Sequence, residues 1–312
     1  MRPDDAALGP LRFTVACANF EAVPRDKSAT LAKIVDQTAQ AAAAGADLVV
    51  FPELALNTWG RCDDCASEHR PCAWHVEQAE VADGESLTAI SEVARRHGIH
   101  VIYGFEERDA GDASTIYNSA NVVSPDGLVG TYRKLHLGIP LETDRFTPGS
   151  ELPVFETDLG PIGISICYDF YNNPELSRIL ALKGARILIN PTGSNDLPGK
   201  AAIITQTTLV RAQENLVYAV SANRVGEQGG QPWAGNSVIG GPAFPGFGHV
   251  LAEAGRSEQL IVATLNFTQL DAWYDWLPWR QWRIGPLSGA SRLVAEEFAA
   301  LAGQTDGHHS SS

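Results

Sequence analysis

Three short segments each place one reactive side chain where a predicted strand gives way to a loop. The segment ADLVVFPE ends on Glu53, GTYRKLHLG contains Lys134, and GPIGISICYD contains Cys167. A thiol, an ammonium group and a carboxylate are together sufficient to attack an amide-like carbon through a covalent thioester. The thiolate attacks, the cation stabilises the oxyanion and the carboxylate moves the protons. Glu53, Lys134 and Cys167 are therefore candidate catalytic residues.

Each of these residues alone has an ordinary structural explanation. A free cysteine is usually a small buried hydrophobic residue, and lysines and glutamates usually lie at the surface. Their joint occurrence is what favours catalysis. The backbone N–H of Tyr168 would then be a second oxyanion donor. We expect Lys134 and the start of a helix near Pro174 to lower the pKa of the Cys167 thiol.

Strands and helices alternate along most of the chain. The predicted strands are residues 11–18, 47–51, 99–105, 161–167, 185–190 and 217–223, and the predicted helices are residues 27–44, 86–97, 174–184 and 202–216. A hairpin is predicted over 115–134, and β-rich sequence follows residue 223. Continuous apolar runs such as DLVVF are typical of strands covered on both faces. This pattern predicts an α/β fold in which two sheets face each other, with helices outside.

Composition limits the classes of partner and location. The chain has 312 residues, 44% of them hydrophobic and 19% charged, with a formal net charge of −14. Nucleic acid and anionic membranes would be repelled by this charge, so neither is expected as a partner. We see no run of about 20 apolar residues and no secretory signal at the N-terminus. Five cysteines, an odd number, favour a reducing compartment, and we expect a cytoplasmic enzyme.

A family resemblance covers the chain from about residue 11 to about residue 267. The segments VVFPE, YRKLHL, ICYD, RAQENLVYAVSANRVG and NSVIGGPAFPGFGHVLAEA resemble the carbon–nitrogen hydrolases of the nitrilase superfamily. The resemblance implies a four-layer αββα sandwich without a cofactor. It also implies Glu53 as general base, Lys134 as oxyanion stabiliser and Cys167 as nucleophile. A second glutamate follows the lysine in amidases of this family, and Glu142 is the candidate here.

We place the hydrolase domain at residues 10–270 and a Trp-rich C-terminal arm and tail at residues 271–312. Four of the seven tryptophans lie in WYDWLPWRQW, near the start of this arm. The arm either packs on its own domain or forms a subunit contact, since exposed aromatic clusters are rare on monomers. Members of the family usually assemble as dimers or larger oligomers, and the resemblance implies the same for this chain. We therefore favour the contact and expect a homodimer or a higher homo-oligomer.

The residues after Cys167 bear on the substrate. True nitrilases tend to have Cys-Trp-Glu there, whereas this chain has Cys-Tyr-Asp, which is similar to amidases and carbamoylases. The following segment Phe-Tyr-Asn-Asn offers no cation for a substrate carboxylate, so a small neutral amide fits better. Tyr168 and Trp59 are candidate walls of the pocket, and Asn57 and Gly193 are candidate polar contacts.

The segment RCDDCASEHRPCAWHVEQ (61–78) is the main departure from the family pattern. Three cysteines and two histidines lie within it: Cys62, Cys65, His69, Cys72 and His75. The first two cysteines have the C-x-x-C spacing of zinc sites, but the rest of the spacing is irregular. The alternatives are a small zinc site and a loop in which the thiols stay free or pair with each other. No metal is included in the predicted active site.

The leading prediction is a cysteine-dependent amidase that converts a carboxamide to an acid and ammonia. An N-carbamoyl-amine hydrolase is the nearest alternative, followed by a nitrilase. An amide-forming acyltransferase would use the same thioester with an amine as acceptor. A non-enzymatic alternative is an inactive or zinc-stabilised interaction module.

Overall fold

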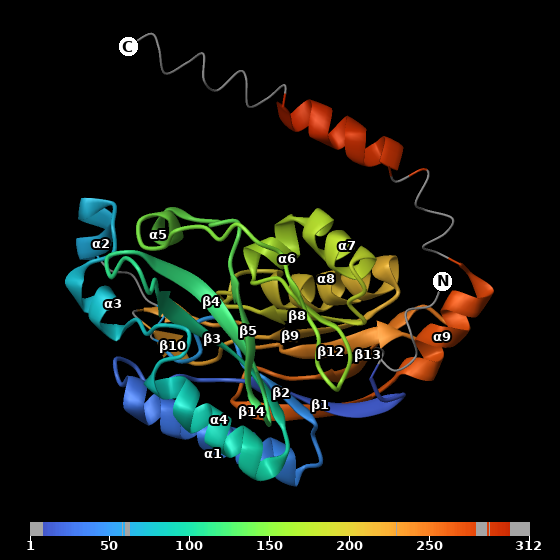
Figure 1. Ribbon diagram of the computed structural model, residues 1–312, viewed down its shortest axis with the longest axis horizontal. Coiled ribbons are helices and arrows are strands. Elements are labelled where there is room, and N and C mark those ends of the chain that lie inside the picture. Colours follow the sequence, from blue (N-terminus) through green and yellow to red (C-terminus); the bar gives the residue numbers. More distant parts are fainter. Residues whose placement is uncertain are drawn as a thin grey trace. The chain divides into compact units, whose positions relative to one another are not determined.

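Two six-stranded β-sheets form the centre of the first of two units in the chain. The computed structural model describes residues 9–57, 59, 63–228, 230–278, 286 and 288–299. The first unit runs from Met1 to Leu270 and the second from Asp271 to Ser312. The sheets, their flanking helices and all the candidate catalytic residues belong to the first unit (Figure 1).

Each sheet has three parallel strands at its centre and antiparallel strands at its edges. The first sheet has the order β14 (Gln259–Asn266), β1 (Arg12–Asn19), β2 (Leu48–Val50), β3 (His100–Arg108), β4 (Ile116–Ser124) and β5 (Gly127–Arg133). The second has the order β13 (Gly248–Glu253), β12 (Val238–Pro242), β9 (Tyr218–Ala222), β8 (Ile187–Pro191), β7 (Ile162–Ile164) and β6 (Val154–Phe155). A separate two-stranded ribbon consists of β10 (Glu227–Gln228) and β11 (Gln231–Pro232).

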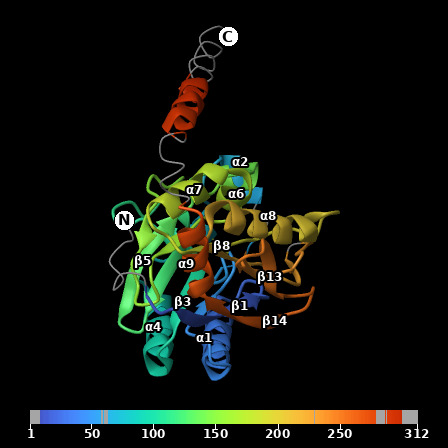
Figure 2. The ribbon, with the colours of Figure 1, turned by 90° about the vertical axis from the view of Figure 1, so that its right-hand side faces the viewer.

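Helices cover the outer faces of both sheets. The first sheet is covered by α1 (Lys27–Ala43) and α4 (Glu85–His97), and the second by α7 (Pro174–Leu182) and α8 (Lys200–Asn215) (Figures 1 and 2). The shorter helices are α2 (Asp63–Glu68), α3 (Ala73–Gln78), α5 (Pro140–Thr143) and α6 (Tyr168–Asn172), and α9 (Phe267–Trp276) follows β14. The prediction of an αββα sandwich is therefore confirmed.

Polar contacts, in addition to apolar packing, join the two facing sheets. The Cys17 thiol of β1 donates to the Ser221 carbonyl of β9 at 3.4 Å. The Ser237 hydroxyl donates to the side-chain oxygen of Asn19 at 2.8 Å. All four residues are fully buried. Because buried polar groups are costly unless they are paired, these contacts favour one alignment of the two sheets.

Local sequence accounts for several element ends. The Asp26 side chain accepts a hydrogen bond from the Ala29 N–H at 2.9 Å and so caps α1. Helix α4 ends at His97 and is capped by Gly98, whose φ of 64° is the left-handed conformation that glycine adopts readily. Strand β7 is shorter than predicted and ends at Ile164. The chain continues along β8 through hydrogen bonds until Cys167, where a φ of 47° turns it into α6.

The C-terminal arm is described only in part. Trp273 and Trp276 contact each other edge to face, with ring centroids 5.4 Å apart. The other two tryptophans of the predicted cluster, at positions 279 and 282, lie outside the described residues. The role of the arm in subunit contact stays a prediction. Among the described residues, we find no helix with the length and apolar content that a membrane crossing needs.

Candidate active site

Glu53 lies in a tight turn directly after β2, and neighbouring groups hold this turn from two sides. The Arg224 guanidinium donates to the carbonyl oxygens of Glu53 and Leu54 at 2.9 and 2.7 Å. On the other side, Gly104 of β3 lies so close that an added Cβ would be 2.5 Å from the Leu54 nitrogen. Leu54 itself has a φ of 48°, which is uncommon for a non-glycine residue. The carboxylate is thus carried by a backbone segment with little freedom to move.

Lys134 bridges two carboxylates at the end of β5. Its Nζ lies 2.8 Å from Oε1 of Glu53 and 2.5 Å from Oε1 of Glu142. The Asn118 amide donates to the same two oxygens, at 2.7 and 3.3 Å. The three charged side chains are no more than 3% exposed. The prediction brought Glu53, Lys134 and Glu142 into one site, and the structure places them in direct contact.

Backbone amides hold the outer oxygen of each carboxylate. The Gly193 N–H donates to Oε2 of Glu53 at 2.8 Å, and the Gly138 N–H donates to Oε2 of Glu142 at 2.7 Å. A Cβ at position 193 would lie 3.1 Å from that same Glu53 oxygen, so glycine allows the close approach. Gly193 was predicted to contact substrate. In the structure its described contact is with the carboxylate of Glu53.

Cys167 occupies the turn between the β7 segment and α6. Its N–H lies 3.1 Å from the Pro191 carbonyl and 2.9 Å from the Asn190 side-chain oxygen, both of which can accept it. Its backbone has φ 47° and ψ −99°, which is unusual for a residue with a side chain. Backbone strain of this kind is often found at functional sites. Tyr168 begins α6, where an N–H has no acceptor within its own helix and can face a ligand.

The charges of the site act directly on the Cys167 thiol. Burial raises its pKa to about 12, with a further rise from the charge of Glu53, while Lys134 lowers it. The expectation of a lowered thiol pKa is therefore wrong, because burial, together with the charges of Glu53 and Glu142, outweighs the opposite effect of Lys134. The thiol is neutral at rest. Attack on a substrate consequently requires a base to take its proton.

Burial and neighbouring charges also change the pKa values of Lys134 and Glu142. Burial acts against the charge of Lys134, but Glu53, Cys167 and Glu142 together raise its pKa above the ordinary value. Lys134 is therefore a permanent cation. Burial raises the pKa of Glu142, Lys134 acts in the opposite direction, and the charge of Glu53 adds to the rise. The site keeps a fixed positive charge between two carboxylates.

Asp169, two residues after the nucleophile, ties α6 to the loop that follows Lys134. Its fully buried carboxylate accepts hydrogen bonds from the Tyr132 hydroxyl at 2.6 Å and from the N–H groups of Leu135 and His136 at 2.9 and 2.8 Å. The His136 ring nitrogen Nδ1 lies 2.9 Å from the same carboxylate. The network holds the strand end that carries the lysine against the helix that begins at the thiol.

Asp169→Asn should lower the free energy of unfolding by about 2–4 kcal/mol, because a neutral amide cannot accept from all these donors and turns an NH₂ group toward some of them. Chemical denaturation followed by circular dichroism measures the change. Tyr132→Phe is the matched control. It removes one donor only and should cost about 1 kcal/mol. Equal stability of the Asp169→Asn variant and the wild type would contradict the structural role of this network.

The remaining predicted site residues have different surroundings. Tyr168 is partly exposed next to Cys167, and its ring would meet a Cβ placed on Gly138. Trp59 is buried in an apolar cluster that includes Leu54, and its ring stacks with that of Phe146 at 6.4 Å. The Asn57 side chain accepts from the Glu106 N–H at 2.8 Å and lies 3.5 Å from the Gln78 carbonyl. The hydrogen bonds described for the Asn57 side chain are therefore with backbone groups.

Sequence reasoning missed three buried residues that position the site, and the signals for them were weak. Asn118 is a polar residue inside the predicted hairpin strand, which is a position where an apolar residue is usual. Arg224 and Asn190 come just after apolar strand segments, as Glu53 does. A charged or amide side chain at the end of a buried strand is therefore informative even when it has no obvious chemical task.

Comparisons with known proteins agree with the family resemblance of the sequence motifs. The family model described as carbon–nitrogen hydrolase matches residues 14–275. A protein named nitrilase from Pyrococcus abyssi is 36% identical over 223 residues, which is 71% of this chain and 77% of that protein. An (R)-stereoselective amidase from Pseudomonas sp. is 36% identical over 74% of this chain and 78% of its own length. Human omega-amidase NIT2 is 31% identical over 74% and 80%.

Solved structures of an amidase from Nesterenkonia sp. are similar to most of this chain. A mutant of that amidase in complex with butyramide has a TM-score of 0.69 and 26% identity, over 86% of this chain and 95% of that chain. A glutamate-to-glutamine mutant carries the acetamide moiety of fluoroacetamide at its active-site cysteine, with a TM-score of 0.69 and 25% identity over 89% and 99%. From the family match over most of its length, we conclude that this chain belongs to the carbon–nitrogen hydrolase family.

Proposed function

We propose that the protein is an amidase that hydrolyses a small neutral carboxamide to an acid and ammonia through a thioester on Cys167. The observation that carries the proposal is the buried contact of Lys134 with both Glu53 and Glu142, next to a thiol on which their charges act. A proton acceptor, a fixed cation and a nucleophile are then within one site.

In the first half of the proposed reaction, the sulfur of Cys167 forms a bond to the amide carbon. Glu53 takes the thiol proton, and the carbonyl electron pair moves to oxygen. The oxyanion lies near the Lys134 ammonium and the Tyr168 N–H, which stabilise it. Glu53 then gives its proton to the leaving nitrogen, the carbon–nitrogen bond breaks, and ammonia leaves a thioester behind.

In the second half, water replaces the amine. Glu53 takes a proton from water, whose oxygen attacks the thioester carbon and forms a second oxyanion on the same donors. The carbon–sulfur bond then breaks, the acid leaves, and the sulfur regains its proton. Glu142 does not exchange protons in this scheme. It orients Lys134 by direct contact, and the Gly138 N–H holds its other oxygen.

The charge balance of the site supports a neutral substrate. Two carboxylates and one ammonium group give Glu53, Lys134 and Glu142 a net charge of −1 before substrate binds. An additional substrate carboxylate would be repelled in a buried site, where charge interactions are strong. The segment Phe-Tyr-Asn-Asn after Tyr168 supplies no compensating cation. A neutral acyl group with apolar character also fits the packed Trp59 and Phe146 rings nearby.

Product analysis tests the proposal against its alternatives. The purified protein would be incubated with aliphatic and aromatic carboxamides, a nitrile of the same acyl group and an N-carbamoyl amine. We expect ammonia and the acid from a carboxamide at the highest kcat/KM. Carbon dioxide together with ammonia would identify a carbamoyl hydrolase, and preference for the nitrile would identify a nitrilase, the name of one relative. Hydroxamate formed with hydroxylamine would trap the acyl-enzyme, and no turnover of any compound would contradict enzyme function.

Glu53→Gln is expected to separate thiol reactivity from proton transfer. Glutamine keeps the shape but cannot take or give the proton, so kcat should fall by about 10²–10⁴. The charge of Glu53 raises the thiol pKa, so its removal should lower that pKa and preserve or speed alkylation of Cys167 by iodoacetamide. Steady-state kinetics and mass spectrometry measure the two effects. Turnover at the wild-type rate would exclude Glu53 as the base.

Self-association is proposed from exposed apolar residues as well as the C-terminal arm. Four large apolar side chains lie exposed on the two helices that cover the second sheet: Ile179, Leu182, Ile203 and Val210. We propose that this surface contributes to a homodimer or larger homo-oligomer. Multi-angle light scattering should give at least twice the chain mass, and Val210→Glu should lower it because a buried unpaired charge is costly. A monomeric wild type would contradict the proposal.

A reducing compartment such as the cytoplasm is the location that we propose. Cys167 is a free cysteine in the structure. In the proposed reaction it must be a free thiol at the start of each cycle. Cytosolic thiols are kept reduced, which matches this requirement.

A further inference from the structure

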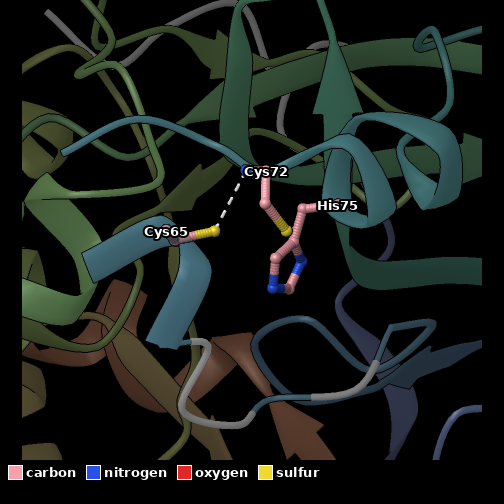
Figure 3. Close-up of side chains that lie close together, drawn as sticks. All are labelled: Cys65, Cys72 and His75. Atoms are coloured by element: carbon pink, nitrogen blue, oxygen red, sulfur yellow. Dashed lines mark hydrogen bonds between the residues drawn. The ribbon is translucent and has the colours of Figure 1, made fainter. Parts of the chain in front are cut away.

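The segment between Trp59 and β3 brings three metal-binding side chains together outside the proposed catalytic site. Cys65 lies on α2, Cys72 precedes α3 and His75 lies on α3, and their side chains point toward one another (Figure 3). One ligand atom from each, two sulfurs and a ring nitrogen, lie within 4.8 Å of one another. Cys65 and His75 are buried and Cys72 is partly buried. The Cys72 N–H donates to the Cys65 sulfur at 3.1 Å.

The surroundings of His75 favour a metal-binding form of its ring. Nδ1 lies 3.0 and 3.2 Å from the two oxygens of Glu106. The Arg145 guanidinium donates to Oε1 of the same Glu106 carboxylate at 3.0 Å, so this carboxylate lies as a hydrogen-bond acceptor between two side chains. Nδ1 must therefore carry a hydrogen, which leaves the lone pair of a neutral His75 on Nε2. A carboxylate that orients a histidine in this way is typical of metal sites.

We propose that Cys65, Cys72 and His75 bind one zinc ion, with Glu106 orienting the histidine. Two thiolates and an imidazole nitrogen are ligands that zinc prefers. At zinc–ligand distances of about 2.0–2.3 Å, tetrahedral geometry places ligand atoms about 3.5–3.8 Å apart. The present arrangement needs movements of about 1 Å or less to reach that spacing. Water or another donor completes the four positions.

Charge balance and local structure both agree with a structural role for the ion. The two thiolates neutralise the charge of zinc, so the buried site has no net charge to desolvate. Helices α2 and α3 have six residues each, well below the length of about 12–15 residues at which isolated helices become stable. A zinc ion that joins both helices would supply the missing stability.

The proposed metal site also connects to the active site through Arg145. Its Nη1 lies 3.0 Å from Glu106, and its guanidinium lies over the Trp59 ring at 5.2 Å. The backbone N–H of Arg145 also donates a hydrogen bond to the backbone carbonyl oxygen of Glu142 at 3.1 Å. The ion would thus help to position Trp59 and the segment that carries Glu142. It would take no part in bond breaking.

His69 and Cys62 also belong to the Cys- and His-rich segment. The His69 side chain is 81% exposed and lies 2.9 Å from a carboxylate oxygen of Asp144, outside the group of three. Cys62 lies outside the described residues. His69 therefore provides a matched control, as a histidine of the same segment that the proposed site does not use.

Zinc binding by the full chain tests the proposal. The protein would be purified under reducing conditions, stripped with a chelator and titrated with zinc in competition with a chromophoric chelator. We expect one zinc per chain, a rise in the melting temperature on binding, and release of thiol protons. Cys72→Ser should weaken zinc binding by more than about 100-fold, and Glu106→Gln by about 10–100-fold. Cobalt should give thiolate charge-transfer absorption in the wild type but not in Cys72→Ser.

Two control variants locate the ion. His69→Ala should bind zinc as the wild type does. Cys167→Ala should also bind one zinc, although it has lost the proposed nucleophile, so the result does not depend on the proposed function. Zinc lost in Cys167→Ala and kept in Cys72→Ser would place the metal on the nucleophile and overturn the proposal. Equal zinc affinity of Cys72→Ser and wild type would do the same.

Thiol protection gives a second measurement in case a variant does not fold. With zinc bound, Cys65 and Cys72 of the wild type should resist N-ethylmaleimide, and peptide mass spectrometry should show both modified after chelation. Reactivity of both cysteines at the same rate with and without zinc would overturn the site. A Cys65–Cys72 disulfide in protein kept under reducing conditions would overturn it as well.

Discussion

Cys167→Ala is expected to lower kcat for a carboxamide on the order of 10⁶-fold, the size seen when another hydrolase loses its catalytic nucleophile. Without the sulfur no thioester can form, and the remaining groups can only activate water. The fold should survive because the side chain is small and half-buried, and because the unusual backbone angles remain. Steady-state kinetics with an ammonia assay and thermal unfolding measure the two properties.

Cys17→Ala is the matched control for loss of a thiol. Cys17 is fully buried between the sheets, and burial raises its pKa well above the ordinary value, so it is an inert side chain. Its replacement should leave kcat unchanged and cost about 1 kcal/mol of stability. Retained turnover in Cys167→Ala, with no other change in the protein, would exclude Cys167 as the nucleophile.

Lys134→Ala is expected to have the second largest effect, with kcat reduced by more than about 10³-fold. Loss of an oxyanion donor alone typically costs about 10²–10³. Here the same cation also separates Glu53 from Glu142, which both bond to it. Without it, two buried carboxylates face each other and share a proton, so the base is partly blocked as well. The loss should appear mainly in kcat.

The pH profile identifies this second effect. Removing the cation makes ionisation of the carboxylate pair less favourable, so the pKa of the pair rises. The acidic limb of the kcat/KM profile should therefore move to higher pH in Lys134→Ala. Lys33→Ala is the control, since Lys33 is an ion-paired lysine of α1 that contacts Glu258. It should leave both kcat and the profile unchanged, and an effect of Lys134→Ala confined to KM would contradict the oxyanion role.

Much of the fold could be predicted because hydrophobic periodicity is a local property. Continuous apolar runs such as Leu48–Val50 identified the central strands, and Gly98 identified the end of α4. Strand β7 was predicted too long because apolar sequence continues to Cys167. Its end depends on a backbone turn that apolar content does not reveal. Periodicity therefore locates an element better than it locates its last residue.

The electrostatics of the site were the part that sequence reasoning reversed. A lysine and a helix start near Cys167 favour a lowered thiol pKa when each is considered alone. The structure adds burial and the charge of Glu53, and together they raise the pKa to about 12. Glu53 and Cys167 lie 114 positions apart in the chain, so their distance cannot be inferred from local sequence. The sequence already named Glu53 as the candidate base, and the raised thiol pKa in the structure explains why a base is needed.

The amino-acid sequence by itself determined the family, the order of strands and helices, and the identity of Glu53, Lys134, Glu142 and Cys167 as candidates, because these depend on residue type and local pattern. Only the tertiary structure decided which carboxylates contact Lys134, which amides hold those carboxylates, and that Cys65, Cys72 and His75 meet. Such contacts depend on distances between remote segments, and electrostatic and coordination energies change steeply with distance.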